Sequence, residues 1–380
     1  MKRAALAVIA LLGCGHATEP TRRTSAEARA YHYQDSSGLL VGTYGVAGRR
    51  RFRGGAVEAK ALADYVRVQP GRAFDPTQPG ADRRAPDAVT SASATAGGGQ
   101  ASRKWRVEGQ LGGDVERQVG EAPVSAGGLV RVSHELDSRS ISGAARSSVE
   151  LGQRNTSLSL LFGYGRDEVR PVEVARGQEA LWPAHHQRWA GALSVSQLLS
   201  PTMVLGAGLA ATWQWGTLAS PYRRALVTPN LLLPESLPSS RDRYSGFLAL
   251  SISLRPNLAL HLQQGGYADD WRVRALIPEA RLSAEVDDGI VLTGGYRYYR
   301  QSAASFYEAT YAAVQPIMSG DVRLGAIEDH TVSFDLRRLT RRGRLDLPIL
   351  AGYQVQLTSY RGVGSRVVAH VFHLGLGADL

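Results

Sequence analysis

The feature that most constrains this chain is a series of segments of about 10–15 residues in which apolar residues occupy every second position. In residues 202–216 the apolar positions are Met203, Leu205, Ala207, Leu209, Ala211, Trp213 and Trp215. Similar alternation recurs over residues 244–255, 344–357 and 372–380. Because successive side chains of a β-strand point to opposite faces, each segment has one apolar face and one polar or small face. The pattern predicts an all-β protein.

The connections between these segments separate a membrane barrel from a soluble β-sandwich, which would show the same alternation. Short turns fall near residues 153–155, 200–201, 256–257, 287–289 and 341–343. Longer connections fall at about 166–187, 218–242, 301–328 and 359–364, with tighter tips near 137–140 and 269–270. Short turns at one end and long loops at the other are typical of outer-membrane barrels. We therefore predict a transmembrane antiparallel up-and-down β-barrel of about 14 strands, with 12 and 16 also open.

Aromatic residues add to this interpretation because they cluster where strands meet the long connections. We assign Trp189, Trp213, Trp215, Tyr244 and Tyr296 to an aromatic girdle at the membrane interface. No apolar run approaches the length of a transmembrane helix.

The N-terminus has the form of a secretory signal, with two cations followed by a short apolar run. We assign residues 1–17 to a signal peptide. Two cleavage sites are open: a lipobox that would leave Cys14 as a lipidation candidate, or ordinary cleavage after Ala17. Residues 18–103 are assigned to an N-terminal region, in which 18–30 form a polar tether, followed by the first strand or strands and an irregular Gly/Pro/Ser-rich segment. Residues 104–380 are assigned to the main barrel.

The formal net charge of +10 raises the question of nucleic acid, but the Arg residues are dispersed and form no compact basic helix. We expect no nucleic-acid partner. The expected partners are outer-membrane lipid and a small periplasmic or surface protein, and the oligomeric state is left open. The expected location is the outer membrane of a Gram-negative bacterium.

No catalytic or metal-binding pattern in the sequence is complete. His185 and His186 are assigned to a long loop beside two Trp residues, with no further ligand at metal-binding spacing. Asp269 and Asp270 could bind a hard cation, but solvated turn residues or acceptors for Arg are the preferred interpretation. His261 and His373 fall on inner faces, where neutral hydrogen bonding is expected. We predict no catalytic residues, no metal, no cofactor and no enzyme activity.

Polar and charged residues on the predicted inner faces bear on transport. The residues expected to face the lumen are His261, Glu285, Arg297, Asp335, Arg337, Asp346, Gln354 and Gln356. Charges at these positions would be unfavourable against lipid but stable against water or one another. They could line an open pore, or they could pair across the lumen and close it.

Several strings near the long connections resemble, in this order along the chain, the bacterial family known as domain of unknown function 3570. They include the Pro-Tyr-Arg and Asp-Asp-Trp elements and the stretch 296–307. The family-motif residues are Pro221, Tyr222, Arg223, Pro234, Arg241, Asp269, Asp270, Trp271, Tyr298, Tyr299, Gln301, Phe306 and Tyr307. The resemblance implies an outer-membrane barrel and supplies no reaction.

Two functions follow as expectations. The first is a channel or transport-type barrel for small solutes, because the inner face is polar and the predicted strand number allows a wide lumen. The alternative is a non-conducting binding or assembly platform that acts through its external loops, where the family strings concentrate.

Overall fold

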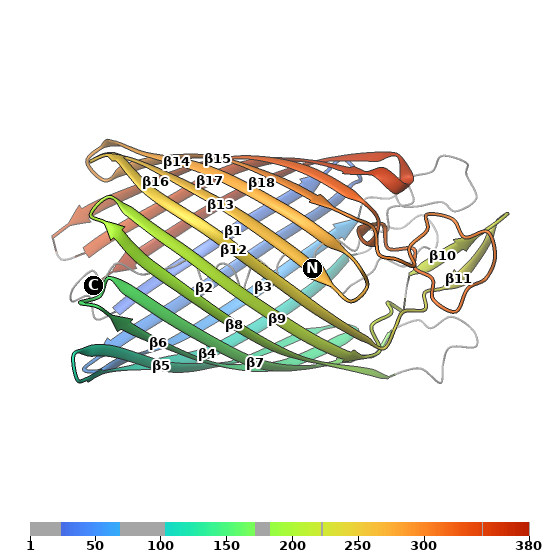
Figure 1. Cartoon of the computed structure of the whole chain (residues 1–380), viewed down its shortest axis with the longest axis horizontal. Coiled ribbons are helices and arrows are strands. Elements are labelled where there is room, and N and C mark those ends of the chain that lie inside the picture. The colour runs from blue at the N-terminus through green and yellow to red at the C-terminus, as the bar shows by residue number, and fades with distance from the viewer. Residues whose placement is uncertain (1–23, 69–102, 172–182, 222, 344, 380) are drawn as a thin grey trace.

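The computed structural model describes residues 24–68, 103–171, 183–221, 223–343 and 345–379. In this part of the chain, 16 antiparallel strands close into a barrel, and β10 and β11 form a separate two-stranded sheet (Figure 1). The strands are β1 (Thr24–Asp35), β2 (Leu39–Phe52), β3 (Gly55–Val68), β4 (Arg103–Val119), β5 (Ala122–Glu135), β6 (Ser138–Leu151), β7 (Thr156–Val169), β8 (Ala184–Ser200), β9 (Met203–Gly216), β10 (Arg224–Val227), β11 (Leu231–Pro234), β12 (Ser240–Arg255), β13 (Leu258–Asp269), β14 (Arg274–Asp287), β15 (Ile290–Gln301), β16 (Ile327–Arg342), β17 (Leu345–Tyr360) and β18 (Ser365–Asp379).

The all-β antiparallel barrel is confirmed, and the described residues form 16 barrel strands, which is one of the open counts and not the preferred count of about 14. Each barrel strand pairs with its neighbours along the chain, with β9 pairing to β12 across the β10–β11 hairpin. The first and last strands complete the ring in a register that sets Ser25 opposite Asp379. Closure leaves the barrel without edge strands, as a sheet in lipid requires.

The N-terminal assignments need correction. A polar tether over residues 18–30 is wrong for its second half, because β1 already begins at Thr24. The first strands predicted within residues 18–103 are β1, β2 and β3, which belong to the same ring as the strands of residues 104–380. The outward positions of β1 are Ala26, Ala28 and Ala30. Alanine is only slightly apolar, so the contrast in hydrophobicity between alternate positions of β1 is too small to mark a strand in the sequence.

The outer face is apolar and exposed, whereas the opposite face of each strand is polar or small. Leu209 and Leu111 are 68% and 67% exposed, and both point away from the lumen. Residues that lie opposite each other on neighbouring strands share a face of the sheet. Leu193 lies opposite Leu160 on one side and Leu209 on the other, so the apolar residues stay on the outside around the ring. A contiguous apolar surface of this extent is typical of a barrel surrounded by lipid.

Short turns gather at one end of the barrel and long connections at the other (Figure 1). Strands β7 and β8 run further than predicted, so the connection predicted at 166–187 spans only residues 170–183. The connection after β9 contains the β10–β11 hairpin, and two short 3-10 helices, η2 (Val322–Leu324) and η3 (Arg361–Val363), lie in later loops. No helix in the described ranges is long and apolar enough to cross a bilayer.

Candidate functional site

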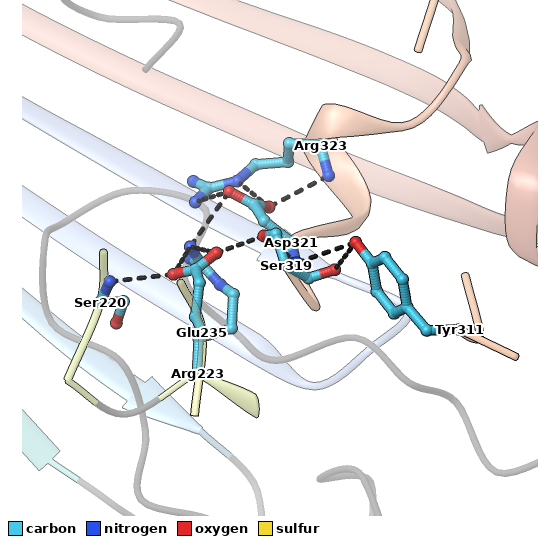
Figure 2. Close-up of polar contacts among 7 residues, drawn as sticks. All are labelled: Ser220, Arg223, Glu235, Tyr311, Ser319, Asp321 and Arg323. Carbon is cyan, nitrogen blue, oxygen red and sulfur yellow. Dashed lines mark hydrogen bonds and ion pairs between the residues drawn. The ribbon is translucent and has the colours of Figure 1, made fainter. Parts of the chain in front are cut away.

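Two long loops, residues 217–239 and 302–326, pack together at one end of the barrel, and we call them the loop cap. Their contact is built on a buried charged cluster, shown in Figure 2. Nη1 of Arg223 lies 3.2 Å from Oε2 of Glu235 and 3.2 Å from Oδ2 of Asp321. The side chain of Arg223 is only 8% exposed and that of Glu235 is fully buried. One guanidinium therefore ties the two loops to each other.

Hydrogen bonds complete the coordination of Glu235. The backbone N–H of Ser220 donates to its Oε2 at 2.9 Å, and the Ser319 hydroxyl donates to its Oε1. Both oxygens of Glu235 accept hydrogen bonds, and Arg223 supplies the opposite charge. These contacts offset the free-energy cost of removing the carboxylate from water.

Asp321 is held by a second arginine from its own loop. Arg323 donates from Nε to Oδ1 and from Nη2 to Oδ2, each at 2.8 Å. Burial alone would raise the pKa of Asp321, but Arg223 and Arg323 outweigh it and hold the pKa well below its usual range. Asp321 is therefore a carboxylate throughout the physiological pH range.

Tyr311 packs at the centre of the apolar part of the loop cap. It is fully buried beside Ala225, Val227 and Met318. Its hydroxyl accepts from the backbone N–H of Ser319 at 2.9 Å and donates to the carbonyl of Phe306 at 3.2 Å. Burial raises the pKa of this phenol. The ring thus joins the hairpin loop to the loop that carries Asp321.

A second buried ion pair fixes the rim of the barrel under the loop cap. Nη2 of Arg241 lies 2.5 Å from Oδ2 of Asp269, which also accepts from the Tyr267 hydroxyl at 2.8 Å. The guanidinium carbon of Arg241 sits 4.2 Å from the ring centroid of Trp271, a cation–π geometry. The indole N–H in turn donates to the carbonyl of Ser240 at 3.0 Å.

Below the rim, ion pairs run along the lumen wall. Examples are Arg131 with Glu108 at 2.9 Å, Arg188 with Asp167 at 2.6 Å, and Arg146 with Asp114 at 3.2 Å. Each of these pairs joins strands that are one or two positions apart in barrel order. They therefore follow the wall and do not bridge the lumen. Many of their side chains keep access to solvent, as Arg131 does at 35%.

A family model described as "Protein of unknown function (DUF3570)" matches residues 87–343. The chain belongs to the DUF3570 family. No curated protein matches it at a significant level.

Solved structures with a similar fold are large outer-membrane barrels. The siderophore receptor PirA from Pseudomonas aeruginosa is 10% identical, with a TM-score of 0.43 over 90% of this chain. The DUF3570 chain spans only 57% of the length of that receptor. A bacterial polysaccharide outer membrane secretin is 8% identical, with a TM-score of 0.48, covering 94% of this chain and 99% of the other. The TodX monoaromatic hydrocarbon channel deltaS2 mutant is 9% identical, with a TM-score of 0.38, over 94% of this chain and 89% of that one.

The family-motif residues of the DUF3570 chain divide between the loop cap and the strand ends. Pro221, Arg223, Pro234, Phe306 and Tyr307 lie in the cap loops. The others with described positions lie on or directly after strands, namely Arg241, Asp269, Asp270, Trp271, Tyr298, Tyr299 and Gln301. Tyr222 and the lipidation candidate Cys14 lie outside the described residues.

The motif residues on β15 face different ways. Tyr298 points outward, where its hydroxyl donates to Glu328 at 3.0 Å. Gln301 points inward and donates from Nε2 to the carbonyls of Arg323 and Gly325, at 2.7 and 2.8 Å. Gln301 therefore attaches the loop cap to the barrel wall.

The residues predicted to face the lumen all lie on the face opposite the exposed apolar residues. The strand registers place His261, Glu285, Arg297, Asp335, Arg337, Asp346, Gln354 and Gln356 there. His261 shares a hydrogen bond of 2.9 Å with Ser251, and Gln356 donates to the fully buried Asp329 at 2.5 Å. Nε2 of His373 lies 3.0 Å from Oδ1 of Asp335, within hydrogen-bond distance.

The predicted girdle residues lie on the outer face. Trp213, Trp215, Tyr244 and Tyr296 are between 36% and 49% exposed. Trp189 lies opposite Trp213 in the register and packs against Tyr164 with ring centroids 4.6 Å apart. All of them lie toward the long-loop end of their strands.

The structure corrects the interpretation of His185 and His186 and decides between the two options for Asp269. His185 and His186 belong to β8, and Nε2 of His186 lies 2.9 Å from Asp167. Asp269 is not a solvated turn residue, because its side chain is fully buried against Arg241; this is the alternative in which it accepts from Arg. Among the described residues, no group of three His, Cys, Asp or Glu side chains is placed to hold a metal ion.

Ser319 and Tyr311 were missed as site residues. Nothing in their local pattern indicates burial, because a Ser and a Tyr in a long polar connection are ordinary surface residues. A usable signal existed for Glu235, which directly follows the family-motif residue Pro234.

Proposed function

We propose that this DUF3570 protein is a channel-type barrel of the Gram-negative outer membrane that passes small solutes and catalyses no reaction. The observation that carries the proposal is the accessibility of lumen-facing charged side chains. Arg29, Lys60 and Arg281 are 47%, 45% and 46% exposed although they point into the barrel. A lumen filled by packed side chains would cover them.

The same architecture supports the proposed location. The exposed apolar outer face suits a lipid environment, and the predicted signal peptide over residues 1–17, ending near Cys14 or Ala17, would direct export. Sucrose-gradient separation of membranes tests this part. Recovery of the protein in the soluble fraction would refute a membrane barrel.

Planar-bilayer recording of the purified, folded protein tests the channel. We expect discrete conductance steps, with heat-unfolded protein from the same preparation as the control. Conductance no greater than that of the empty membrane would contradict the proposal.

The second candidate, a non-conducting binding or assembly platform, is favoured by one specific observation. The family strings converge on the loop cap, from which the β10–β11 hairpin projects beyond the barrel end (Figure 1). Leu231 in this hairpin is 48% exposed and Val314 in the other cap loop is 61% exposed. Affinity purification from native membranes tests it: a stoichiometric partner is expected, and clean recovery of the barrel alone would count against it.

A further inference from the structure

One cross-strand row on the lumen face contains cations and no carboxylate. The register connects Lys60, Gln110, Arg131, Ser142, Gly165, Arg188, Gln214 and Arg241 in sequence. We call this the basic row. It crosses eight neighbouring strands, β3 to β9 and β12, which is half of the ring. Its four cations are separated only by amide, hydroxyl and glycine positions.

The basic row runs obliquely along the lumen. Barrel strands tilt by about 35–45° from the axis, so a line perpendicular to the strands climbs along the axis as it goes round. The row therefore begins at the middle of β3 with Lys60 and reaches the long-loop end with Arg241, which lies one residue into β12. It provides a path from the interior of the barrel to the rim under the loop cap.

The carboxylates beside the basic row are more deeply buried than the cations they contact. Arg131 is 35% exposed and its partner Glu108 12%, whereas Arg188 is 30% exposed and Asp167 13%. In the same way, the side chain of Lys60 is 45% exposed and that of Glu58 is 13% exposed. A solute in the lumen therefore meets guanidinium and ammonium groups before it meets carboxylates.

Two details keep Arg131 and Arg188 available, whereas Arg241 is buried against Asp269. Gly165 has no side chain, and a Cβ there would lie 2.8 Å from Nε of Arg188, so the guanidinium lies across the Gly165 backbone. Glu108 also contacts Arg106 at 3.2 Å, and Asp167 also contacts His186 at 2.9 Å. Because Glu108 is shared between two guanidinium groups, Arg131 is only partly neutralised.

At the rim, Arg243 adds a further cation two residues along β12 from Arg241. Its Nε has no hydrogen-bond partner among the described residues. The facing carboxylate, Asp269, is already occupied by Arg241, Tyr267 and the N–H of Val273. The Nε–H of Arg243 is thus a lumen-facing donor without an acceptor among the described residues.

We propose that the basic row, with Arg243 at its upper end, makes the lumen a path for small anions. Arginine side chains on a pore wall attract anions and repel cations, and a water-filled passage bounded by low-dielectric walls strengthens that field. This inference rests on the proposed channel function and specifies its solute class.

The test is the reversal potential of the purified protein in a planar bilayer under a KCl gradient. The row variant carries Lys60→Gln, Arg131→Gln and Arg188→Gln. Folding should persist, because Glu108 keeps Arg106 and Asp167 keeps His186, and the shift in gel mobility on heating checks it. A matched control carries Arg29→Gln, Arg281→Gln and Arg297→Gln, which remove three lumen-facing charges outside the row.

We expect the wild-type protein to favour chloride over potassium. The chloride-to-potassium permeability ratio should fall about threefold in the row variant and change little in the control. Equal loss in both variants would overturn the role of the row, since total charge would then suffice. Conductance without anion preference would overturn this inference and leave the channel standing. Absence of conductance would remove both proposals.

Discussion

At the scale of single residues, the loop cap depends on charges that are removed from water and are stable only as a set. Arg223 serves Glu235 and Asp321 together, and Arg323 adds a second guanidinium to Asp321. Breaking such a set leaves a buried charge without its partner, which is far more destabilising than losing an exposed pair.

Glu235→Gln should therefore loosen the loop cap while the barrel remains folded. We expect a loss of about 3 kcal/mol in local stability, at the lower end for a broken buried pair because Arg223 retains Asp321. Limited proteolysis read by mass spectrometry should show new cleavage within residues 217–239 and 302–326. Glu308→Gln is the control, since Glu308 is exposed in the same cap; similar cleavage in both variants would contradict the prediction.

Asp321 predicts the response of the loop cap to acid. Its pKa in the folded protein is depressed, so its contribution to stability is present above the ordinary carboxyl pKa of 3.8 and is lost as pH falls through the lower, folded value. Resistance of the cap to pepsin should thus persist through mildly acidic pH and fail only below 3.8. Opening of the cap already at mildly acidic pH would show that another group controls it.

Gly352 on β17 allows His373 and Asp335 to meet over its backbone, with Nε2 and Oδ1 3.0 Å apart. A Cβ at this position would overlap both His373 and Asp335. Gly352→Ala should separate the pair and lower barrel stability by about 1–3 kcal/mol through overpacking. Thermal unfolding in detergent measures the effect. Gly266→Ala is the matched control, because a Cβ there meets nothing within 4 Å; equal losses would argue against the overlap.

At the scale of strands, the two faces of each element experience different solvents. Neighbouring residues of β8 illustrate this, since Leu193 is 46% exposed on the apolar outer face and Ser194 points into the lumen. The alternation was readable from the sequence because it is a local property of the backbone. The hairpin β10–β11 was not, because its short strands, Arg224–Val227 and Leu231–Pro234, show too few alternations to stand out.

Leu193→Arg and Ser194→Arg should therefore differ sharply. Arginine on the lipid face near the middle of a strand destabilises a barrel by about 2–4 kcal/mol, whereas a lumen position tolerates it. Refolding yield in lipid vesicles, measured by the heat-dependent shift in gel mobility, compares the two. Comparable yields for both variants would contradict the assigned faces of β8.

At the scale of the whole molecule, the barrel is closed by the pairing of the first strand with the last. A chain lacking residues 24–35 would leave β2 and β18 as open edges with unpaired backbone groups in lipid. We expect it not to fold into a barrel.

Moving residues 24–35 to follow Asp379 through a short turn should restore folding, because β1 and β18 are antiparallel and Ser25 lies opposite Asp379. Refolding yield again provides the measurement. Folding of the shortened chain without this addition would show that β1 is dispensable.

The sequence by itself determined the strand class, the facing of most side chains and the end of the barrel that carries the long loops. These follow from a period of two residues and from turn composition, which are local. Only the tertiary structure decided that β1 closes the ring, that Arg223 joins Glu235 to Asp321, and that the cations from Lys60 to Arg241 fall in one row. These relations depend on the register between strands and on contacts between loops far apart in the chain, which no local pattern encodes.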